Sequence, residues 1–205
     1  MDELENKNVV EISKSKKSFF VEIFKFALIA ILIVVPFRLY VAQPFIVSGA
    51  SMDPTFHDGD YLVIDQLSHN FKDPHRGEVV IFRYPKDETK FFIKRIIGLP
   101  NETVEIHSGV VVIKNKDYPD GFALTEAYIT LENKKVTDFS SFKLGDEEFF
   151  VLGDNRLASL DSRVWGAVPE KLIVGRPLVR VLPIDQIGTL PGTMQFAQWG
   201  VDEKN

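Results

Sequence analysis

A serine and a lysine in this chain have the surroundings that nucleophilic catalysis requires. Ser51 lies in the stretch SGASMDPT at 48–55, whose glycine, aspartate and proline are also common in turns. A serine hydroxyl becomes an effective nucleophile when a nearby base accepts its proton. Lys94 lies in FFIKRIIG at 91–98, and apolar neighbours of this kind lower the pKa of a lysine until it can act as that base. The competing interpretation places Ser51 in a simple turn and Lys94 on an exposed strand edge, where lysine discourages aggregation.

Other kinds of catalytic site find little support in the sequence. The absence of cysteine removes thiol nucleophiles, disulfides and cysteine-bound zinc. None of the histidines shows the paired spacing of a metal site; they are His57, His69, His75 and His107. Neither glycine-rich nucleotide-binding pattern occurs, and a net charge of −5 argues against a nucleic-acid surface. We therefore expect no cofactor, no metal and no nucleic acid, and His57, close to Ser51 in the sequence, is the alternative base.

An apolar segment that precedes these residues is suited to a membrane. The stretch FFVEIFKFALIAILIVVPF occupies 19–37, and its 19 residues would form a helix of about 28 Å, close to the thickness of a hydrocarbon core. Glu22 and Lys25 lie near its start, where long side chains reach the interface or pair with each other. A removable signal peptide is the alternative, but bulky residues follow Pro36 instead of the small residues of a cleavage site. We predict a single transmembrane anchor.

The charges beside this segment predict its orientation. Lys14, Lys16 and Lys17 precede it, whereas only Arg38 follows it closely. Positively charged flanks stay in the cytoplasm. We therefore expect a cytoplasmic segment at 1–18 and, beyond the anchor, an extracytoplasmic domain at the cell membrane.

The remainder of the chain has the pattern of short β-strands. β-Branched and aromatic residues fill six runs, most of which are bounded by glycine, proline, aspartate or asparagine. These runs are 61–65, 78–82, 91–99, 102–113, 147–154 and 172–184. Sustained helical periodicity is missing here, so we predict a mainly β, antiparallel, barrel-like domain over 38–195 with a tight turn at 107–110. A more polar, less regular insertion is expected at about 114–146, and 196–205 is a C-terminal tail.

Three stretches follow one another behind the apolar segment: SGASMDPT, FIKRIIGLP and GDNRLASLDSRVWG. In this order they resemble the sequence boxes of the type I signal peptidases, which are membrane-anchored Ser-Lys proteases. The resemblance covers 45–183 and is weakest over 114–146. It implies a catalytic β-domain behind a single anchor, and an enzyme that removes signal peptides from exported preproteins. Its partners would be secretory preproteins and membrane lipid.

The resemblance also implies a role for each matching residue. Ser51 matches the nucleophile, Lys94 the general base, and Ser159 a second serine that orients the lysine amine. Structural support is implied for the charged residues Arg95, Asp154, Arg156, Asp161 and Arg163. The backbone N–H of Ser51 is expected to form part of an oxyanion hole. Gly49 stands where some members have a serine that donates a second hydrogen bond, so the second donor is either another backbone group or absent.

Cleavage specificity follows from the way in which a strand presents alternate side chains. Signal peptides end in small residues at the first and third positions before the cut, and these two side chains point the same way in an extended substrate. The segment PFIVSGAS at 44–51 is expected to receive the substrate as an edge strand. By resemblance, Phe45, Val47 and Ile93 wall two shallow pockets.

Two other functions are compatible with parts of the pattern. A membrane-tethered β-domain that binds or scaffolds exported proteins without chemistry would leave Ser51 and Lys94 without a catalytic role. A self-cleaving repressor shares Ser-Lys chemistry, but such proteins carry a DNA-binding head where this chain has its apolar segment. Loss of all turnover on replacing both residues would distinguish the peptidase from the scaffold.

Overall fold

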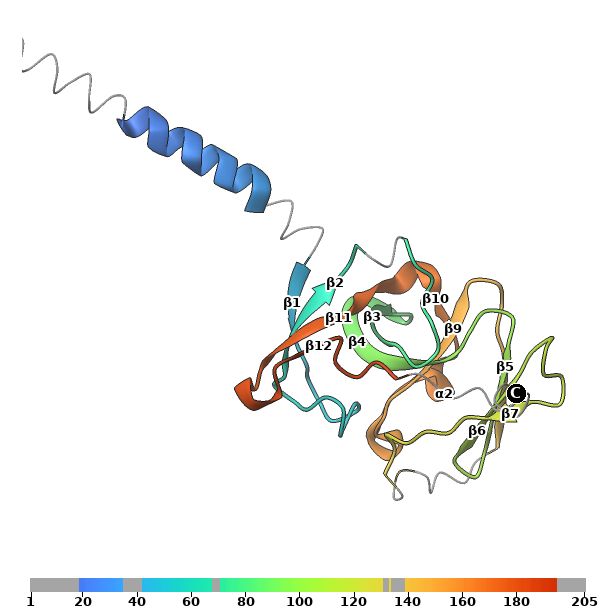
Figure 1. The fold of residues 1–205 in the computed structure, drawn as a ribbon. Helices are drawn as coiled ribbons and strands as arrows, with labels where there is room; N and C mark the ends of the chain where they lie inside the picture. Colours follow the sequence, from blue (N-terminus) through green and yellow to red (C-terminus); the bar gives the residue numbers. More distant parts are fainter. Residues whose placement is uncertain (1–18, 35–41, 68–70, 131–132, 134–138, 195–205) are drawn as a thin grey trace, which may run out of the picture. The chain divides into compact units, whose positions relative to one another are not determined.

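The computed structural model describes most of the chain, which forms two compact units, Met1–Val41 and Ala42–Asn205 (Figure 1). The described residues are 19–34, 42–67, 71–130, 133 and 139–194. In the first unit, residues 19–34 are helical. The end of the predicted anchor, the predicted cytoplasmic segment and the tail lie outside the described residues. Among the residues described, no helix combines the length and the apolar character that crossing a membrane requires.

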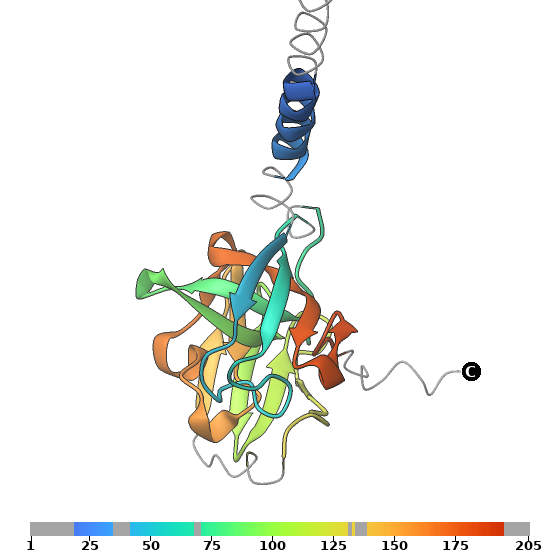
Figure 2. The same cartoon turned by 90° about the vertical axis from the view of Figure 1, so that its left-hand side faces the viewer.

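The second unit is built around a large antiparallel sheet. Its hydrogen-bonded order is β1-β2-β11-β3-β4-β9-β10, with β12 beside β11. The strands are β1 Ala42–Ile46, β2 Tyr61–Asp65, β3 Val79–Tyr84, β4 Asp87–Gly98, β9 Glu148–Leu152, β10 Val168–Pro169, β11 Ile173–Leu182 and β12 Gly188–Thr189. Figure 2 shows β1 and β2 side by side. Among the described strands the order ends at β1 and at the two-residue β10, so hydrogen bonds do not close the expected barrel and β1 keeps one edge free.

A second, smaller sheet has the order β7-β6-β5-β8 and is also antiparallel. Its strands are β5 Thr103–His107, β6 Val110–Lys114, β7 Phe122–Ala123 and β8 Ser140–Lys143. Ser108 and Gly109 both have positive φ angles, 48° and 80°, and form the predicted tight turn between β5 and β6. The predicted insertion contributes β7 and β8 to this sheet, so part of it is regular.

The described helices of the second unit are short. They are η3 Arg156–Ala158, α2 Ser162–Trp165, η4 Glu170–Leu172 and η5 Ile184–Gln186. Each of the six predicted runs overlaps at least one strand. The prediction of a mainly β, antiparallel domain is therefore confirmed.

Three apolar clusters hold these strands together. One lies around β3, β4 and β9 and includes Trp165, and another fills the small sheet. The third joins the segment after β1 to β2 and β3; its buried members are Val47, Met52, Phe56, Leu62, Ile64, Val79 and Ile81. Because Met52 and Phe56 are fully buried, the third cluster fixes the turn that carries Ser51.

Candidate active site

Ser51 lies in a turn whose neighbours are fixed on both sides. Val47 extends the pairing of β1 beyond its last residue through hydrogen bonds to the residues before β2. On the other side, the Phe56 N–H donates to the Met52 carbonyl oxygen at 2.9 Å. The carbonyl oxygen of Ser51 itself accepts a hydrogen bond from the Asn155 N–H at 3.0 Å, which ties the turn to the loop after β9.

Lys94 comes from the middle of β4, where it pairs with Val80 of β3. Strand alternation places Phe92, Lys94 and Ile96 on one face, as predicted. Accordingly, Lys94 Nζ lies 5.5 Å from the centre of the Phe92 ring, and Ile96 belongs to the cluster that Phe92 packs against. The lysine is only 4% exposed. The alternative of an exposed edge lysine is therefore wrong, because apolar neighbours cover the side chain.

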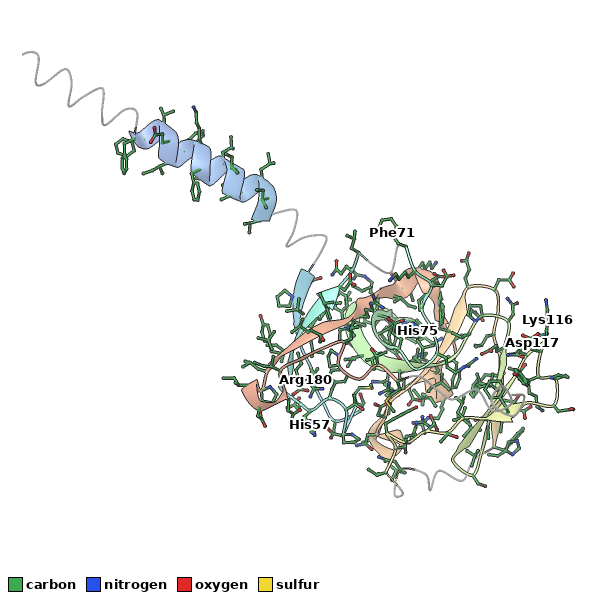
Figure 3. All side chains as sticks on the ribbon, viewed as in Figure 1. His57, Phe71, His75, Lys116, Asp117 and Arg180 are labelled. Atoms are coloured by element: carbon green, nitrogen blue, oxygen red, sulfur yellow. The ribbon has the colours of Figure 1, made fainter. Side chains whose placement is uncertain are left out.

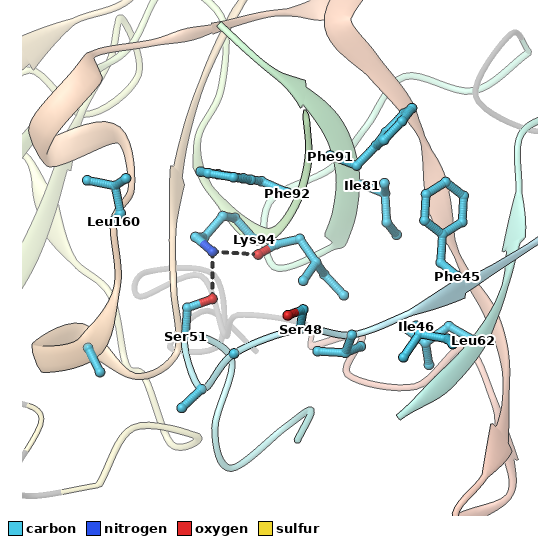
Figure 4. Close-up of a pocket in the computed structure, with 15 residues that line it drawn as sticks. Phe45, Ile46, Ser48, Ser51, Leu62, Ile81, Phe91, Phe92, Lys94 and Leu160 are labelled. Carbon is cyan, nitrogen blue, oxygen red and sulfur yellow. Dashed lines mark hydrogen bonds between the residues drawn. The ribbon is translucent and has the colours of Figure 1, made fainter. Parts of the chain in front are cut away.

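The two residues meet at an apolar groove (Figure 4). Lys94 Nζ donates a hydrogen bond to Ser51 Oγ at 2.6 Å and another to the Ile93 carbonyl oxygen at 2.8 Å. When the amine is neutral, the Ser51 hydroxyl becomes the donor in the same contact. The nucleophile and base expected from the sequence are thus within direct proton-transfer distance.

Burial changes the protonation of this lysine. It lowers the pKa of Lys94 from 10.5 to about 8, because the ammonium form loses its hydration. The carboxylates of Asp161 and Asp154 act in the opposite direction by favouring the charged form, but burial has the larger effect. A substantial fraction of neutral amine is therefore present near pH 8.

Ser159 shares no hydrogen bond with Lys94 in the described part of the chain. Its Oγ is buried and without a hydrogen-bond partner, while the Ile93 carbonyl takes a second N–H of the lysine. Ser159 still lies beside the Ser51 turn, because a Cβ on Gly153 would come within 2.2 Å of Ser159 Oγ and 2.4 Å of the Ser51 carbonyl oxygen. An ammonium has three N–H donors. The orienting role of Ser159 stays a prediction, in which Ser159 Oγ would accept a hydrogen bond from the third N–H of Lys94.

The residue that follows the lysine in the sequence, Arg95, forms a buried ion pair. Arg95 and Asp154 are both fully buried, and two hydrogen bonds join them, from Nε to Oδ1 at 2.8 Å and from Nη2 to Oδ2 at 2.6 Å. The Thr55 hydroxyl also donates to Asp154 Oδ2, at 2.5 Å. Fork-shaped pairs of this kind fix geometry as well as charge. The pair holds β4 against the loop that binds the Ser51 carbonyl.

A second ion pair braces the loop around Ser159. Asp161 Oδ1 accepts a hydrogen bond from Arg163 Nε at 2.7 Å, and its Oδ2 accepts others from Arg163 Nη2 at 2.8 Å and from the Gly153 N–H at 3.1 Å. Arg163 Nη2 also donates to the Arg156 carbonyl oxygen at 2.7 Å. These contacts support the structural roles that the resemblance implies for Asp161 and Arg163.

Arg156 pairs with a residue that sequence reasoning missed. Its guanidinium donates from Nη1 to Glu126 Oε2 at 3.1 Å and from Nη2 to Oε1, while Nε donates to the Gly153 carbonyl oxygen at 2.9 Å. The Tyr128 hydroxyl donates to Glu126 at 2.6 Å, and the Tyr128 ring lies 4.2 Å from the Arg95 guanidinium carbon. The predicted insertion therefore closes over the buried arginines behind the site.

The groove beside the pair has a volume of about 410 Å³. The predicted pocket residues Phe45, Val47 and Ile93 line it together with Ser51 and Lys94. Four further lining residues, Ile46, Ser48, Gly49 and Ala50, belong to the segment 44–51 that is expected to receive the substrate. The lining residues that were not predicted are Leu62, Ile81, Phe91, Phe92, Ala158 and Leu160. Most of this wall is apolar, and residues of the edge strand β1 form part of it.

The three described histidines, His57, His75 and His107, do not line this groove. The His57 side chain is half exposed at the surface and lies 3.8 Å from Asp53 (Figure 3). His75 and His107 are also half exposed, and His69 lies outside the described residues. Across the described ranges, no group of three or more histidine, aspartate or glutamate side chains is arranged to hold a metal ion.

Comparison with known families extends this picture. The family model described as "Signal peptidase, peptidase S26" matches residues 20–182. The chain belongs to the signal peptidase family. The resemblance to type I signal peptidases is thereby confirmed, and with it the expectation of a serine endopeptidase.

Individual members of the signal peptidase family match along most of the chain. A probable signal peptidase I-2 of Synechocystis sp. is 37% identical over 194 residues, which cover 89% of this chain and 85% of the relative. Signal peptidase I T of Bacillus subtilis is 31% identical, over 91% of this chain and 98% of the relative. A crystal structure of a signal peptidase I from Enterococcus faecalis matches 51% of this chain and 97% of its own, with 30% identity and a TM-score of 0.44. Family membership rests on the sequence matches.

Proposed function

We propose that this chain removes N-terminal signal peptides from secretory preproteins by cutting after small-x-small motifs, with Ser51 as the nucleophile and Lys94 as the general base. The observation that carries the proposal is the 2.6 Å hydrogen bond between these two side chains, beside an apolar groove. Membership of the signal peptidase family supplies the reaction. The contact supports the assignment of the two reacting groups.

In the first step, Ser51 Oγ attacks the carbonyl carbon of the scissile peptide bond while its proton passes to the neutral amine of Lys94. The peptide C–N bond then breaks, and Lys94 returns the proton to the leaving nitrogen. The mature protein leaves with a free amino group, and the signal peptide remains as an ester on Ser51.

In the second step, a water molecule attacks the ester carbonyl and gives a proton to the regenerated amine of Lys94. The ester C–O bond breaks, and the proton returns to Ser51 Oγ. The signal peptide leaves as a carboxylic acid. Water, peptide and protons balance over the cycle, and the first and last proton transfers, between Ser51 and Lys94, use the same short contact.

Negative charge on the substrate carbonyl oxygen requires hydrogen-bond donors. The backbone N–H of Ser51 is the first proposed donor. The Gly49 N–H is already engaged, because it donates to Asp58 Oδ1 at 2.7 Å. The Ser48 hydroxyl lines the same groove (Figure 4), and we propose this side chain as the second donor, which differs from the two alternatives left by the sequence.

The substrate is proposed to bind as an additional strand beside β1. In the described sheet β1 pairs only with β2, so its other edge is open to main-chain hydrogen bonds from an extended peptide. Phe45, Val47 and Ile93 lie along the groove that leads to Ser51. They would admit alanine at the first and third positions before the cut and exclude larger side chains.

The enzyme is proposed to work at the outer face of the cell membrane. The apolar segment 19–37 would be its single anchor and 1–18 its cytoplasmic part. The composition of this segment and the lysines before it support this arrangement. Residue 38 onwards would then be extracytoplasmic, where exported preproteins emerge.

The test uses full-length protein in detergent, a secretory preprotein and sequencing of the new N-terminus. Wild-type protein should make one cut after a small-x-small motif, and Ser51→Ala and Lys94→Ala should each reduce the rate by about 10⁴-fold or more. His57→Ala is the matched control and should cleave normally, because His57 does not line the groove. The double variant should resemble either single one, since nucleophile and base act as a unit. Substantial cleavage by Lys94→Ala would reject the lysine base and return His57 as a candidate.

A further inference from the structure

A short C-terminal segment, residues 190–194, packs behind both catalytic candidates; we call it the strap. It follows β12 and lies beyond residue 182, where the match to the family model ends. We propose that the strap positions the Ser51–Lys94 pair and that Gly192 is its positioning residue. This inference rests on the function proposed above.

The strap completes the hydrogen bonding of the buried Arg95 side chain. Arg95 Nη1 donates to the carbonyl oxygens of Gly192 and Gly77. Nε and Nη2 donate to Asp154, and Nη2 also reaches Thr55 Oγ1 at 3.4 Å. All five N–H groups of the guanidinium therefore have acceptors, one of which is on the strap. Without it, a charged N–H on the residue next to the general base would lack an acceptor or draw in water.

The strap also packs against the turn that carries Ser51. Gly192 has a backbone φ angle of +78°, which residues with a side chain rarely adopt. A Cβ at this position would come within 2.7 Å of Thr55 Cγ2 and 2.8 Å of Phe56 Cε2. Phe56 is fully buried and closes the turn through its hydrogen bond to Met52. Glycine is therefore required for the strap to approach this turn.

Both ends of the strap are held in place. At its start, the Leu190 N–H donates to the Leu178 carbonyl oxygen of β11 at 2.7 Å. At its end, the Met194 N–H donates to the Gly77 carbonyl oxygen at 3.3 Å. Because Gly77 also binds Arg95, the end of the strap and the buried arginine share one acceptor residue. The strap is thus fixed to the core from both directions.

These contacts link the strap to each half of the catalytic pair. Thr55 lies four residues after Ser51, and Arg95 follows Lys94 in β4. A shift of these neighbours would lengthen the 2.6 Å contact through which the proton moves. The strap does not line the groove, so its displacement acts on the chemical step and leaves substrate binding intact.

Gly192→Ala in the full-length chain tests this inference, with Gly188→Ala as the matched control. Gly188 lies in β12, and a Cβ there would meet only the Gln186 carbonyl oxygen, at 4.0 Å. We expect Gly192→Ala to lower kcat about tenfold with KM within about twofold, because a misplaced catalytic pair slows chemistry. Gly188→Ala should leave both constants unchanged.

The pH profile separates positioning from simple destabilisation. Loosened packing beside Arg95 admits water and reduces the desolvation that lowers the Lys94 pKa. The rising limb of kcat/KM in Gly192→Ala should therefore move to higher pH. Ile113→Val, in the core of the small sheet, lowers stability without this shift and serves as the stability control.

Thr55→Ser provides a rescue in the Gly192→Ala background. Serine removes the Cγ2 atom that the new methyl group would meet and keeps the hydroxyl that binds Asp154. We expect partial recovery of kcat relative to Gly192→Ala. If Gly192→Ala does not fold, this double variant is compared with Thr55→Ser alone, and a fall in kcat of less than about tenfold is expected, because the remaining contact with Phe56 still displaces the strap.

Two results would overturn the positioning role. One is a Gly192→Ala enzyme with the kcat and pH profile of wild type. The other is a loss no larger than that of an Ile113→Val enzyme of equal stability. Failure of the wild-type protein to cut a preprotein would reject the proposed function instead, and this is seen before any variant is compared.

Discussion

Burial and two carboxylates act on the Lys94 amine in opposite directions. Loss of hydration favours the neutral form, and Asp161 and Asp154 favour the ammonium. If burial acted alone, the amine would be neutral but weakly basic, and such a base accepts protons poorly. The balance leaves a base whose pKa of about 8 is close to physiological pH, where general-base catalysis is most effective.

The pH dependence of cleavage tests this balance. Because only the neutral amine accepts a proton, kcat/KM should rise with pH and reach half of its maximum near the Lys94 pKa of about 8. Well below that pH, each unit of acidification should cost about tenfold in rate. The measurement is kcat/KM from about pH 6 to 10, with circular dichroism confirming the fold. A rate that fell between neutral pH and nine in folded protein would contradict a lysine base.

The second oxyanion donor gives another prediction at the level of single residues. Ser48→Ala should lower kcat by about 10²-fold with little change in KM, because the hydrogen bond strengthens as charge develops on the oxygen. Ser141→Ala, an exposed serine on β8, is the matched control. Steady-state kinetics on one preprotein measures both. An unchanged kcat in Ser48→Ala would reject Ser48 as the second donor. The Ser51 N–H would then act with a different donor or alone.

Local sequence predicts some site residues and misses others for a physical reason. The apolar flanks of Lys94 are adjacent in the chain, so its burial can be predicted from a strand pattern. Glu126 and Tyr128 carry no such signal, because their partner Arg156 lies 30 and 28 residues away, respectively. A glutamate and a tyrosine in a polar stretch have the composition of a surface loop. Their burial depends on a contact that only the folded chain makes.

Among the strands, β1 has five residues and one free edge in the described sheet. A strand added to that edge would present every second side chain to the groove. The proposed pockets therefore depend on two strands together, since Phe45 lies on β1, Val47 directly extends it and Ile93 lies on β4.

A preprotein series tests these pockets. Leucine or phenylalanine at the first or third position before the cut should lower kcat/KM roughly ten- to hundredfold, because overfilling a tight apolar site costs on the order of 1–3 kcal/mol. The residue between them should tolerate almost any side chain, since it points away from the groove. The measurement is kcat/KM for substrates varied at each of these three positions. Equal cleavage of alanine and phenylalanine at the first position would reject the two-pocket arrangement.

The contact between the insertion and the loop after β9 predicts a difference in stability. Glu126→Gln leaves the buried Arg156 guanidinium without its counter-charge and should lower the free energy of unfolding by about 3 kcal/mol. Glu105→Gln is the control, because its partner Lys114 is partly exposed and such pairs contribute little to stability. Urea denaturation measures both. Similar losses in the two variants would show that the buried pair gives no special support.

Strand positions are predictable where a strand buries its own side chains. The run 61–65 coincides with β2. β4 starts at Asp87 instead of 91, because its polar first residues are held by the hairpin to β3 and carry no apolar pattern of their own. Pairing to a neighbour, rather than burial, decides such boundaries.

For the whole molecule, orientation at the membrane is the main prediction. Protease added to intact cells or spheroplasts should digest the domain from residue 38 onwards and spare a tag at the N-terminus, because the lysines at 14, 16 and 17 retain that end in the cytoplasm. Immunoblots against both ends report the result. Detergent-lysed cells, in which both ends are cut, are the control. Protection of the domain in intact cells would reverse the topology.

The fold as a whole is predictable only in class. Alternating apolar residues indicate antiparallel strands, and the described sheets confirm this. The division into two sheets depends on pairings between distant segments, such as β11 with β2 and β3, which local patterns do not contain. The last part of the predicted anchor lies outside the described residues, and the anchor itself stays a prediction.

The free edge of β1 has a consequence for the protein in isolation. An unpaired strand edge also receives β1 of a second copy, and this is the contact through which β-proteins self-associate. The strand is short and contains Pro44, which cannot donate a main-chain hydrogen bond, so pairing between copies is limited. A peptide that occupies this edge should remove the remaining pairing between copies. We therefore expect such a peptide to increase the solubility of the concentrated protein.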